Sequence, residues 1–183
     1  MRTLVALAAL ALATPALAAG KFTLTSQDVK PGATLTDQQV FNGFGCSGAN
    51  VSPELSWRSA PAGTKSFVLT VYDPDAPTGS GWWHWVVYDI PASAKELPQG
   101  AGSGKAALPE GAKQARTDFG APGFGGACPP PGDRPHRYVF TIHALKLDRL
   151  EVPADASPAM IGFMTRANSL GSASFTAKYA RKK

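Results

Sequence analysis

Short apolar runs, separated by segments rich in Pro, Gly and Asn, recur along most of the chain and are typical of β-strands. Two runs, 67–72 and 82–90, are rich in β-branched and aromatic residues and predict buried strands. Weaker signals predict a first strand at 22–26, a short strand at 55–57 and an edge strand at 114–119. The chain therefore reads as mostly β.

The segment 137–147 has the strongest strand pattern. Its side chains alternate between two faces, one of which carries Tyr138, Phe140, Ile142 and Ala144. His136 directly precedes the segment and extends the same face if the backbone stays extended. His143 lies seven residues further on, an odd number, so it should point the opposite way. We therefore interpret His143 as structural and His136 as a candidate site residue.

One helix is expected near the C-terminal end. Ser157 is a favourable N-cap and Pro158 a favourable first helical residue. Apolar residues follow at helical spacing as far as Leu170, with Gly171 past the expected end, and the segment 173–179 then alternates as a final strand. Because strands dominate without a βαβ rhythm, we expect two packed, mostly antiparallel sheets with a peripheral helix.

The first residues have the pattern of a secretory signal peptide. A positive start at Arg2 precedes an apolar run at 4–12 and the small-x-small sequence at 16–18. We expect cleavage near Ala18 or Ala19, which makes 1–19 the signal peptide and 20–183 a single domain. The run is too short for a membrane span, and no other stretch is apolar enough. The mature protein is therefore expected in the periplasm or outside the cell, without a transmembrane segment.

Charge and cysteine content narrow the functional classes. The net charge is +5, and +4 once Arg2 is removed, and part of it lies in the last residues. This modest bias, with no basic stripe interleaved with aromatics, argues against nucleic-acid binding. In an oxidising compartment, Cys46 and Cys128 most simply form one disulfide. The alternative is a Cys128 nucleophile with His136 as its base, which leaves Cys46 without a role.

Candidate chemistry gathers around the loop between the two buried strands. Asp73 ends the first strand and His84 lies near the start of the second, so their side chains can approach at one end of a sheet. Polar groups on a rigid loop rim suit a small-ligand pocket. The alternative is structural, with Asp73 and Asp75 as turn formers and His84 as a satisfied core residue.

A second loop, 123–133, is rich in Gly and Pro. Gly125 and Gly126 would allow the backbone to approach a ligand closely, and the prolines at 129–131 hold the following chain rigid. A disulfide to Cys128 would clamp this loop. The alternative is a plain surface loop pinned by that disulfide.

Four motifs occur in order along the chain. They are F-N-G-F-G-C-S-G-A-N-V-S-P at 41–53, Y-D-P-D-A-P at 72–77, W-W-H-W-V-V at 82–87 and C-P-P-P-G-D-R-P-H-R-Y at 128–138. Together they resemble the phosphatidylethanolamine-binding protein family, in particular its bacterial Raf kinase inhibitor-like branch. The resemblance implies a sandwich of two antiparallel sheets with one or two peripheral helices, and a small anion pocket.

The resemblance also implies the residues of that pocket. They are Asp73, His84 and His136, a wall made by the backbone of Gly125, Gly126 and Ala127 and the rings of Pro129 and Pro130, and the hydroxyl of Tyr138. We expect both histidines, and backbone N–H groups of the glycine loop arranged as a nest, to donate to an anion, with Asp73 orienting one imidazole.

The expected function is therefore a non-catalytic binding protein of the cell envelope, without a cofactor. Its ligand would be a small anion or a phosphorylated head group, and a partner protein could be modulated through the pocket. Two alternatives stay open. One is a regulator that binds a protease or a host protein independently of the pocket. The other is a metal-dependent enzyme, because one Asp and two His resemble a two-His-one-carboxylate site.

Overall fold

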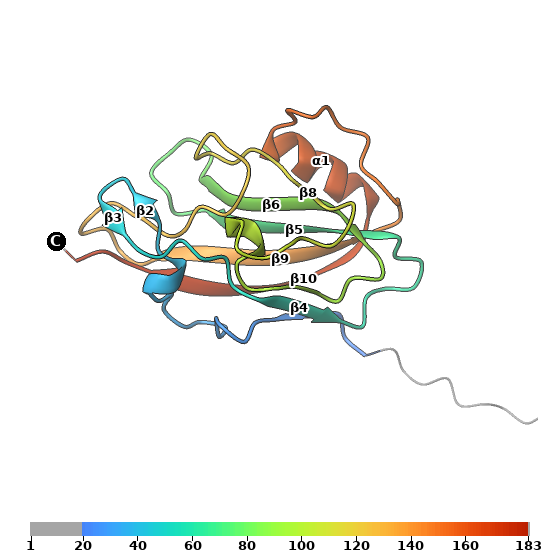
Figure 1. The fold of residues 1–183 in the computed structure, drawn as a ribbon, viewed down its shortest axis with the longest axis horizontal. Helices are drawn as coiled ribbons and strands as arrows, with labels where there is room; N and C mark the ends of the chain where they lie inside the picture. Colours follow the sequence, from blue (N-terminus) through green and yellow to red (C-terminus); the bar gives the residue numbers. More distant parts are fainter. Residues whose placement is uncertain (1–19, 183) are drawn as a thin grey trace, which may run out of the picture.

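The computed structural model describes residues 20–182, so the predicted signal peptide at 1–19 lies outside the described residues. The largest unit within them is an antiparallel sheet of five strands in the order β10-β9-β5-β6-β8 (Figure 1). Its strands are β5 (Ser66–Asp73), β6 (Trp82–Pro91), β8 (Lys113–Gln114), β9 (His136–Leu145) and β10 (Ser169–Tyr179).

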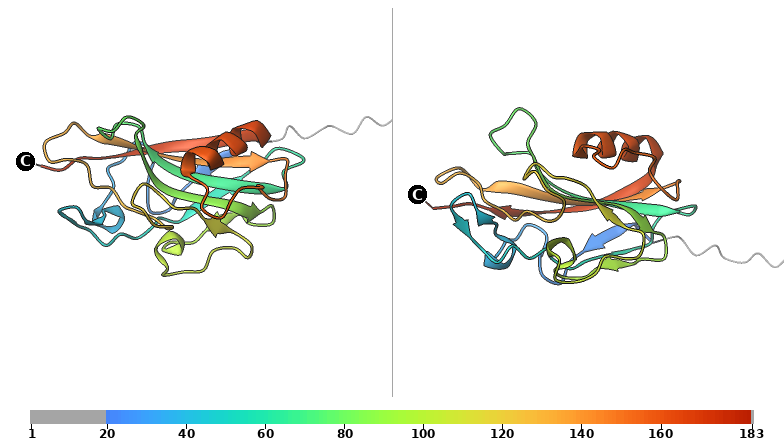
Figure 2. Two further views of the ribbon diagram at one scale, coloured as in Figure 1. Left: turned by 90° about the horizontal axis from the view of Figure 1, so that it is seen from above. Right: turned by 45° about the horizontal axis from the view of Figure 1, so that its top comes forward.

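Two smaller sheets and a helix complete the architecture. An antiparallel sheet in the order β1-β4-β7 lies on one side of the large sheet and α1 lies on the other (Figure 2). The hairpin β2-β3 stands at one end of the sandwich. The bounds are β1 (Thr23–Thr25), η1 (Asp37–Gln39), β2 (Asn42–Gly43), β3 (Cys46–Ser47), β4 (Leu55–Arg58), β7 (Glu96–Leu97), η2 (Ala101–Ser103) and α1 (Pro158–Asn168). The expected mostly β sandwich of antiparallel sheets with a peripheral helix is confirmed.

The main core lies between the two larger sheets. There Trp57 of β4 packs in one cluster with Phe67 and Leu69 of β5. Val68, on the opposite face of β5, belongs to a second cluster with Ile161 of α1. Because β5 is covered on both faces, its sequence is a continuous apolar run rather than an alternating one.

The two faces of β9 are as predicted. His136 and the apolar side chains of alternate residues are buried toward the sandwich core. His143 lies on the other face, where it lines a groove beside α1 together with Thr165 and Arg166. The parity argument therefore separates the two histidines correctly.

The helix ends earlier than the sequence predicted. It begins at the predicted N-cap, where the Ser157 hydroxyl accepts a hydrogen bond from a backbone amide of the first turn. It ends at Asn168, whereas the apolar spacing predicted an end at Leu170. Ser169 already pairs with Leu145 of β9, so hydrogen bonds to the neighbouring strand replace those of the helix. The structure contains, within residues 20–182, no helix with the length and hydropathy of a membrane crossing.

The predicted edge strand at 114–119 is confirmed only in part. Lys113 and Gln114 pair with β6 as β8, and Ala115 still donates to the carbonyl of Val86 in β6 at 3.0 Å. The chain then turns, because the amide of Thr117 donates to the carbonyl of Ala121 at 3.0 Å. The turn carries Phe119 to the pocket described below instead of along the edge of the sheet.

Candidate ligand-binding pocket

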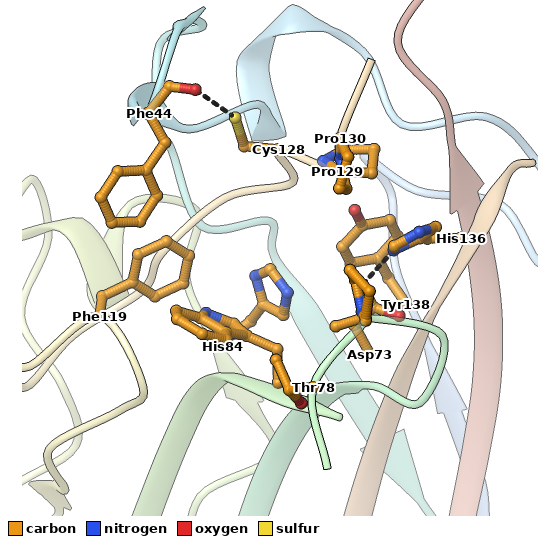
Figure 3. A pocket seen from close by; sticks show the side chains of 13 residues that line it. Phe44, Asp73, Thr78, His84, Phe119, Cys128, Pro129, Pro130, His136 and Tyr138 are labelled. Carbon is orange, nitrogen blue, oxygen red and sulfur yellow. Dashed lines mark hydrogen bonds and ion pairs between the residues drawn. The ribbon is translucent and has the colours of Figure 1, made fainter. Parts of the chain in front are cut away.

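A pocket of about 210 Å³ lies at the end of the sandwich where β5 ends and where β6 and β9 begin (Figure 3). Four buried polar side chains, each at most 3% exposed, line its inner part. They are Asp73, His84, His136 and Tyr138. Aromatic rings and prolines line the remainder, chiefly Phe44, Trp82, Phe119, Pro77, Pro129 and Pro130. The structure thus brings together six of the nine predicted ligand-binding residues.

A β-bulge directs His84 into this pocket. Val71 pairs with Trp85 and Tyr72 pairs with Trp83, so His84 is an extra residue between the two pairs. Regular alternation would turn His84 away from the face that Trp85 occupies. With the bulge, both side chains are buried on the core side of β6, and Trp83 packs on the other side.

His136 lies between two carboxylates. Its Nδ1 is 2.7 Å from Oδ2 of Asp73, and its Nε2 is 3.3 Å from Oδ2 of Asp133. A carboxylate only accepts, so both bonds form together when the ring carries a proton on each nitrogen. Asp73 therefore orients an imidazole as expected. The expectation that His136 donates to an anion does not fit, because both of its nitrogens are already engaged.

Asp73 and the neighbouring Asp75 also shape the loop after β5. The second oxygen of Asp73 accepts the amide of Asp75 at 2.8 Å, so Asp73 is a turn former as well as a partner of His136. Asp75 receives the guanidinium and backbone N–H of Arg137 and the guanidinium of Arg134. The hydrogen bond from the Arg137 side chain is the main cause that lowers the pKa of Asp75 to about 2.

His84 keeps one ring nitrogen without a protein partner. Its Nδ1 is 2.7 Å from the carbonyl oxygen of Gly125 and therefore donates, while its Nε2 is buried and unpaired. Burial lowers the pKa of His84 below its ordinary value of 6.5, and the bond to Gly125 opposes this only in part. At neutral pH the ring is therefore uncharged, and Nε2 presents a lone pair to the pocket.

Unpaired polar atoms concentrate in this pocket. In residues 20–182, five buried side-chain nitrogen or oxygen atoms have no hydrogen-bond partner, and three of them belong to pocket residues. These three are Nε1 of Trp82, Nε2 of His84 and the hydroxyl of Tyr138. Burial is the main cause that raises the pKa of Tyr138, and the negative charge of Asp73 is the second. The phenol of Tyr138 therefore stays protonated. Each such atom costs roughly 1–3 kcal/mol if it remains unsatisfied.

The glycine loop does not form the expected anion nest. The amides of Gly125, Gly126 and Ala127 donate to the His84 carbonyl, the Asn50 side chain and the Gln39 carbonyl, at 2.9, 2.7 and 2.9 Å. None of the three residues is among those that line the pocket. The backbone of this loop closely approaches other parts of the protein instead of the pocket.

A Cβ on Gly125 would collide with the ring of Phe119, and one on Gly126 with the backbone at 39–41. The loop thus positions His84 and Phe119 rather than the ligand. The two glycines were correctly singled out, but for a contact with the protein rather than with a bound molecule.

The predicted disulfide between Cys46 and Cys128 is confirmed. It joins β3 to the loop before β9, and Cys128 lines the pocket beside Pro129 and Pro130. This bond also removes the alternative of a Cys128 nucleophile. Arg181, near the C-terminal end, reinforces the junction, since its guanidinium donates to the carbonyls of Gly45 at 2.8 Å and Pro129 at 3.4 Å.

Sequence reasoning missed several contributors to the site, among them Trp82, whose indole N–H is one of the three unpaired atoms of the pocket. Asp133 was unnoticed, although its spacing of three residues from His136 could have suggested a contact. Asn50 holds the glycine loop through bonds to Gly126 and to the Phe124 carbonyl, and its place in the 41–53 motif was the only signal. Phe44 and Phe119 are recognisable only once the chain is folded. Across the described range 20–182, no three His, Cys, Asp or Glu side chains gather as a metal ion would require.

Comparisons with known proteins identify relatives of this chain. The YbcL protein of Escherichia coli is 51% identical to this chain over 183 residues, which is the full length of both chains. The YbhB protein of the same organism is 56% identical over 157 residues, which cover 86% of this chain and 99% of YbhB. A Mycobacterium tuberculosis protein named lipoprotein LppC is 36% identical over 144 residues, 79% of this chain and 65% of that protein.

The crystal structure of YbcL matches with a TM-score of 0.85 at 53% identity, over 89% of this chain and 100% of that chain. The family model described as phosphatidylethanolamine-binding protein matches residues 25–180. Together with the fold and the four motifs, these matches show that the chain belongs to the phosphatidylethanolamine-binding protein family.

Proposed function

We propose that this protein binds a small phosphoryl-bearing anion in the pocket, without catalysing its conversion. The convergence of three unpaired, buried polar atoms in one pocket carries the proposal. The Trp82 indole N–H only donates, and the Tyr138 hydroxyl can donate. Oxygen atoms of an anion would satisfy both at once, in a site where hydrogen bonds to charged groups are strong.

The lone pair on His84 makes the expected binding proton-dependent. A fully ionised phosphate offers nothing to donate to Nε2, whereas a singly charged phosphate monoester carries a P–OH that can. Alternatively, the bound anion recruits a proton to His84 against the effect of burial. Above the second pKa of the ester, about 6, either route takes up a proton on binding, so affinity rises as the pH falls toward that value.

Three observations favour binding over catalysis. Both cysteines are joined in the disulfide. The ring nitrogens of His136, which could otherwise act as a base, both lie against carboxylates. The hydroxyl of Tyr138 is kept protonated by burial. The cysteines, His136 and Tyr138 are thus held in other roles, and we assign the free lone pair of His84 to ligand binding.

We place the protein in the cell envelope as part of the same proposal. The signal-peptide pattern at 1–19 supports export. A disulfide is expected to persist in an oxidising compartment, and one relative carries the name of a lipoprotein. Cell fractionation of the full chain, with N-terminal sequencing of the product, tests the location; a cytoplasmic protein that retains Met1 would contradict it.

Calorimetric titration with methyl phosphate tests the binding proposal. We expect tighter binding at pH 5.5 than at pH 8, and at pH 8 the observed enthalpy should depend on the ionisation enthalpy of the buffer because a proton is taken up there. His84→Ala should abolish that buffer dependence. Equal affinity at both pH values would remove His84 from the mechanism, and no binding at either would refute the proposed function.

A further inference from the structure

An exposed phenylalanine stands at the mouth of the pocket. Phe44 lines the pocket, yet it is 69% exposed (Figure 3). Large apolar side chains are ordinarily retained because they are buried in the core. The ring of Phe44 packs against Phe41 and Phe119, with centroid distances of 5.4 and 5.9 Å, yet most of the side chain stays exposed at the pocket mouth.

The backbone at Phe44 is also unfavourable for this residue type. Phe44 and Gly45 have φ values of 52° and 79°, in the left-handed region, and lie between β2 and β3. Hairpin turns of this form favour Asn, Asp or Gly at both positions. A bulky residue with positive φ is an outlier, and strain of this kind is concentrated at functional sites.

Two separate parts of the chain hold this strained tip in place. The disulfide from Cys46 ties β3 to the pocket wall at Cys128. Arg181 donates to the carbonyl oxygens of Phe44 and Gly45, at 3.5 and 2.8 Å. The position of the exposed ring is therefore fixed by tertiary contacts rather than left to the hairpin alone.

The ring of Phe44 continues an aromatic wall that begins deep in the pocket. Its plane lies 12° from that of Phe119, with the centroids 5.9 Å apart. Phe119 in turn meets Trp82 and His84 edge-on, at 5.5 and 5.4 Å. A ligand whose anion bonds to Trp82 and His84 would therefore place its next group beside Phe119 and Phe44.

We infer that Phe44 is a specificity-determining residue that selects ligands whose anionic group carries an aromatic ring. The inference rests on the proposed anion site and names the class of ligand that site takes: small aryl phosphate monoesters. The pocket, at about 210 Å³, is smaller than most small-molecule sites, so it accommodates the anion and one ring at the mouth. Stacking of a flat ring on Phe44 would cover part of the surface that this side chain leaves exposed.

The experiment compares phenyl phosphate with methyl phosphate, which has the same anionic group but no ring. We expect wild type to bind phenyl phosphate about tenfold more tightly, as one well-placed aromatic pair with its buried area allows. Phe44→Gly should reduce that preference to about twofold or less, by weakening phenyl phosphate binding much more than methyl phosphate binding, and glycine accepts the positive φ of this turn. Phe44→Tyr should retain the preference.

Phe163→Ala is the matched control, because Phe163 is equally exposed, at 72%, but lies on α1 away from the pocket. It should change neither affinity. The inference is overturned if wild type binds both esters equally, or if Phe44→Gly weakens both by the same factor; in either case the anion site itself would still stand. Failure of both esters to bind would overturn the anion site and this inference together.

Discussion

At the residue scale, the pocket is defined by groups that the protein itself leaves unpaired. Trp82 is the clearest of them because an indole N–H has no role other than donor. Tyr138 and His84 can change roles with the ligand, whereas His136 cannot, being held between Asp73 and Asp133. The donors that we propose for anion recognition are thus distinct from the group that organises the site.

Substituting Trp82→Phe should therefore weaken methyl phosphate binding by about 10- to 100-fold, from the loss of one charge-assisted hydrogen bond of roughly 1.5–3 kcal/mol. Trp57 offers a matched control, since its Nε1 is also buried and unpaired but lies in the main core. Trp57→Phe should leave the affinity unchanged in the same calorimetric titration. Equal weakening by the two variants would show that the effect is structural.

Much of the polar site could be predicted because strand parity and motifs act on single residues. His136 begins a regular strand, so counting residues gave its direction, and Asp73 was located by its place at the end of a buried strand. The roles of Gly125 and Gly126 could not be predicted. Glycine signals a close approach of some group to the backbone, but only the fold reveals that the group is Phe119 or residue 39–41 backbone rather than a ligand.

At the element scale, irregular features do most of the positioning. The bulge in β6 turns His84 inward, and nothing in the sequence W-W-H-W-V-V distinguishes it from regular alternation. Phe119 reaches the pocket because a turn replaces the predicted edge strand. Regular strands were predictable from periodicity, whereas a bulge or turn depends on hydrogen bonds made with other parts of the chain.

The disulfide joins two such irregular elements, the β2-β3 hairpin and the loop before β9, across 82 residues of sequence. Replacing both Cys46 and Cys128 by Ser should lower the free energy of unfolding by about 2–4 kcal/mol, measured by urea denaturation. Methyl phosphate binding should persist, because its donors come from β6 and β9. Arg181→Gln is a control that loosens the same junction without breaking a covalent bond. Complete loss of methyl phosphate binding in a folded double variant would show that the donors of β6 and β9 depend on the disulfide, which would contradict this prediction.

At the scale of the whole molecule, we expect the stability of the fold to depend on pH in the sense opposite to the proposed ligand binding. Burial lowers the pKa of both His84 and His143. The unfolded chain binds protons at these positions near pH 6.5, while the folded state still holds them neutral. The unfolded state then carries more protons, so stability falls as the pH drops from about 7.5. Asp75, with its pKa lowered to about 2, contributes a separate loss only between about pH 4 and 2.

The free energy of unfolding, measured by urea denaturation at pH 7.5, 6.5 and 5.5, should therefore decrease by at most about 1.4 kcal/mol per pH unit for each histidine, and the urea midpoint should decrease with it. Saturating methyl phosphate should offset part of that decrease, because a ligand that binds only the folded state stabilises it more as its affinity rises. His143→Gln should reduce the decrease and leave the effect of methyl phosphate intact, since His143 faces α1 and not the pocket. Midpoints that stay constant or rise toward pH 5.5 would show that the buried histidines are not held neutral, and the lone pair on His84 would no longer be available to a protonated ligand.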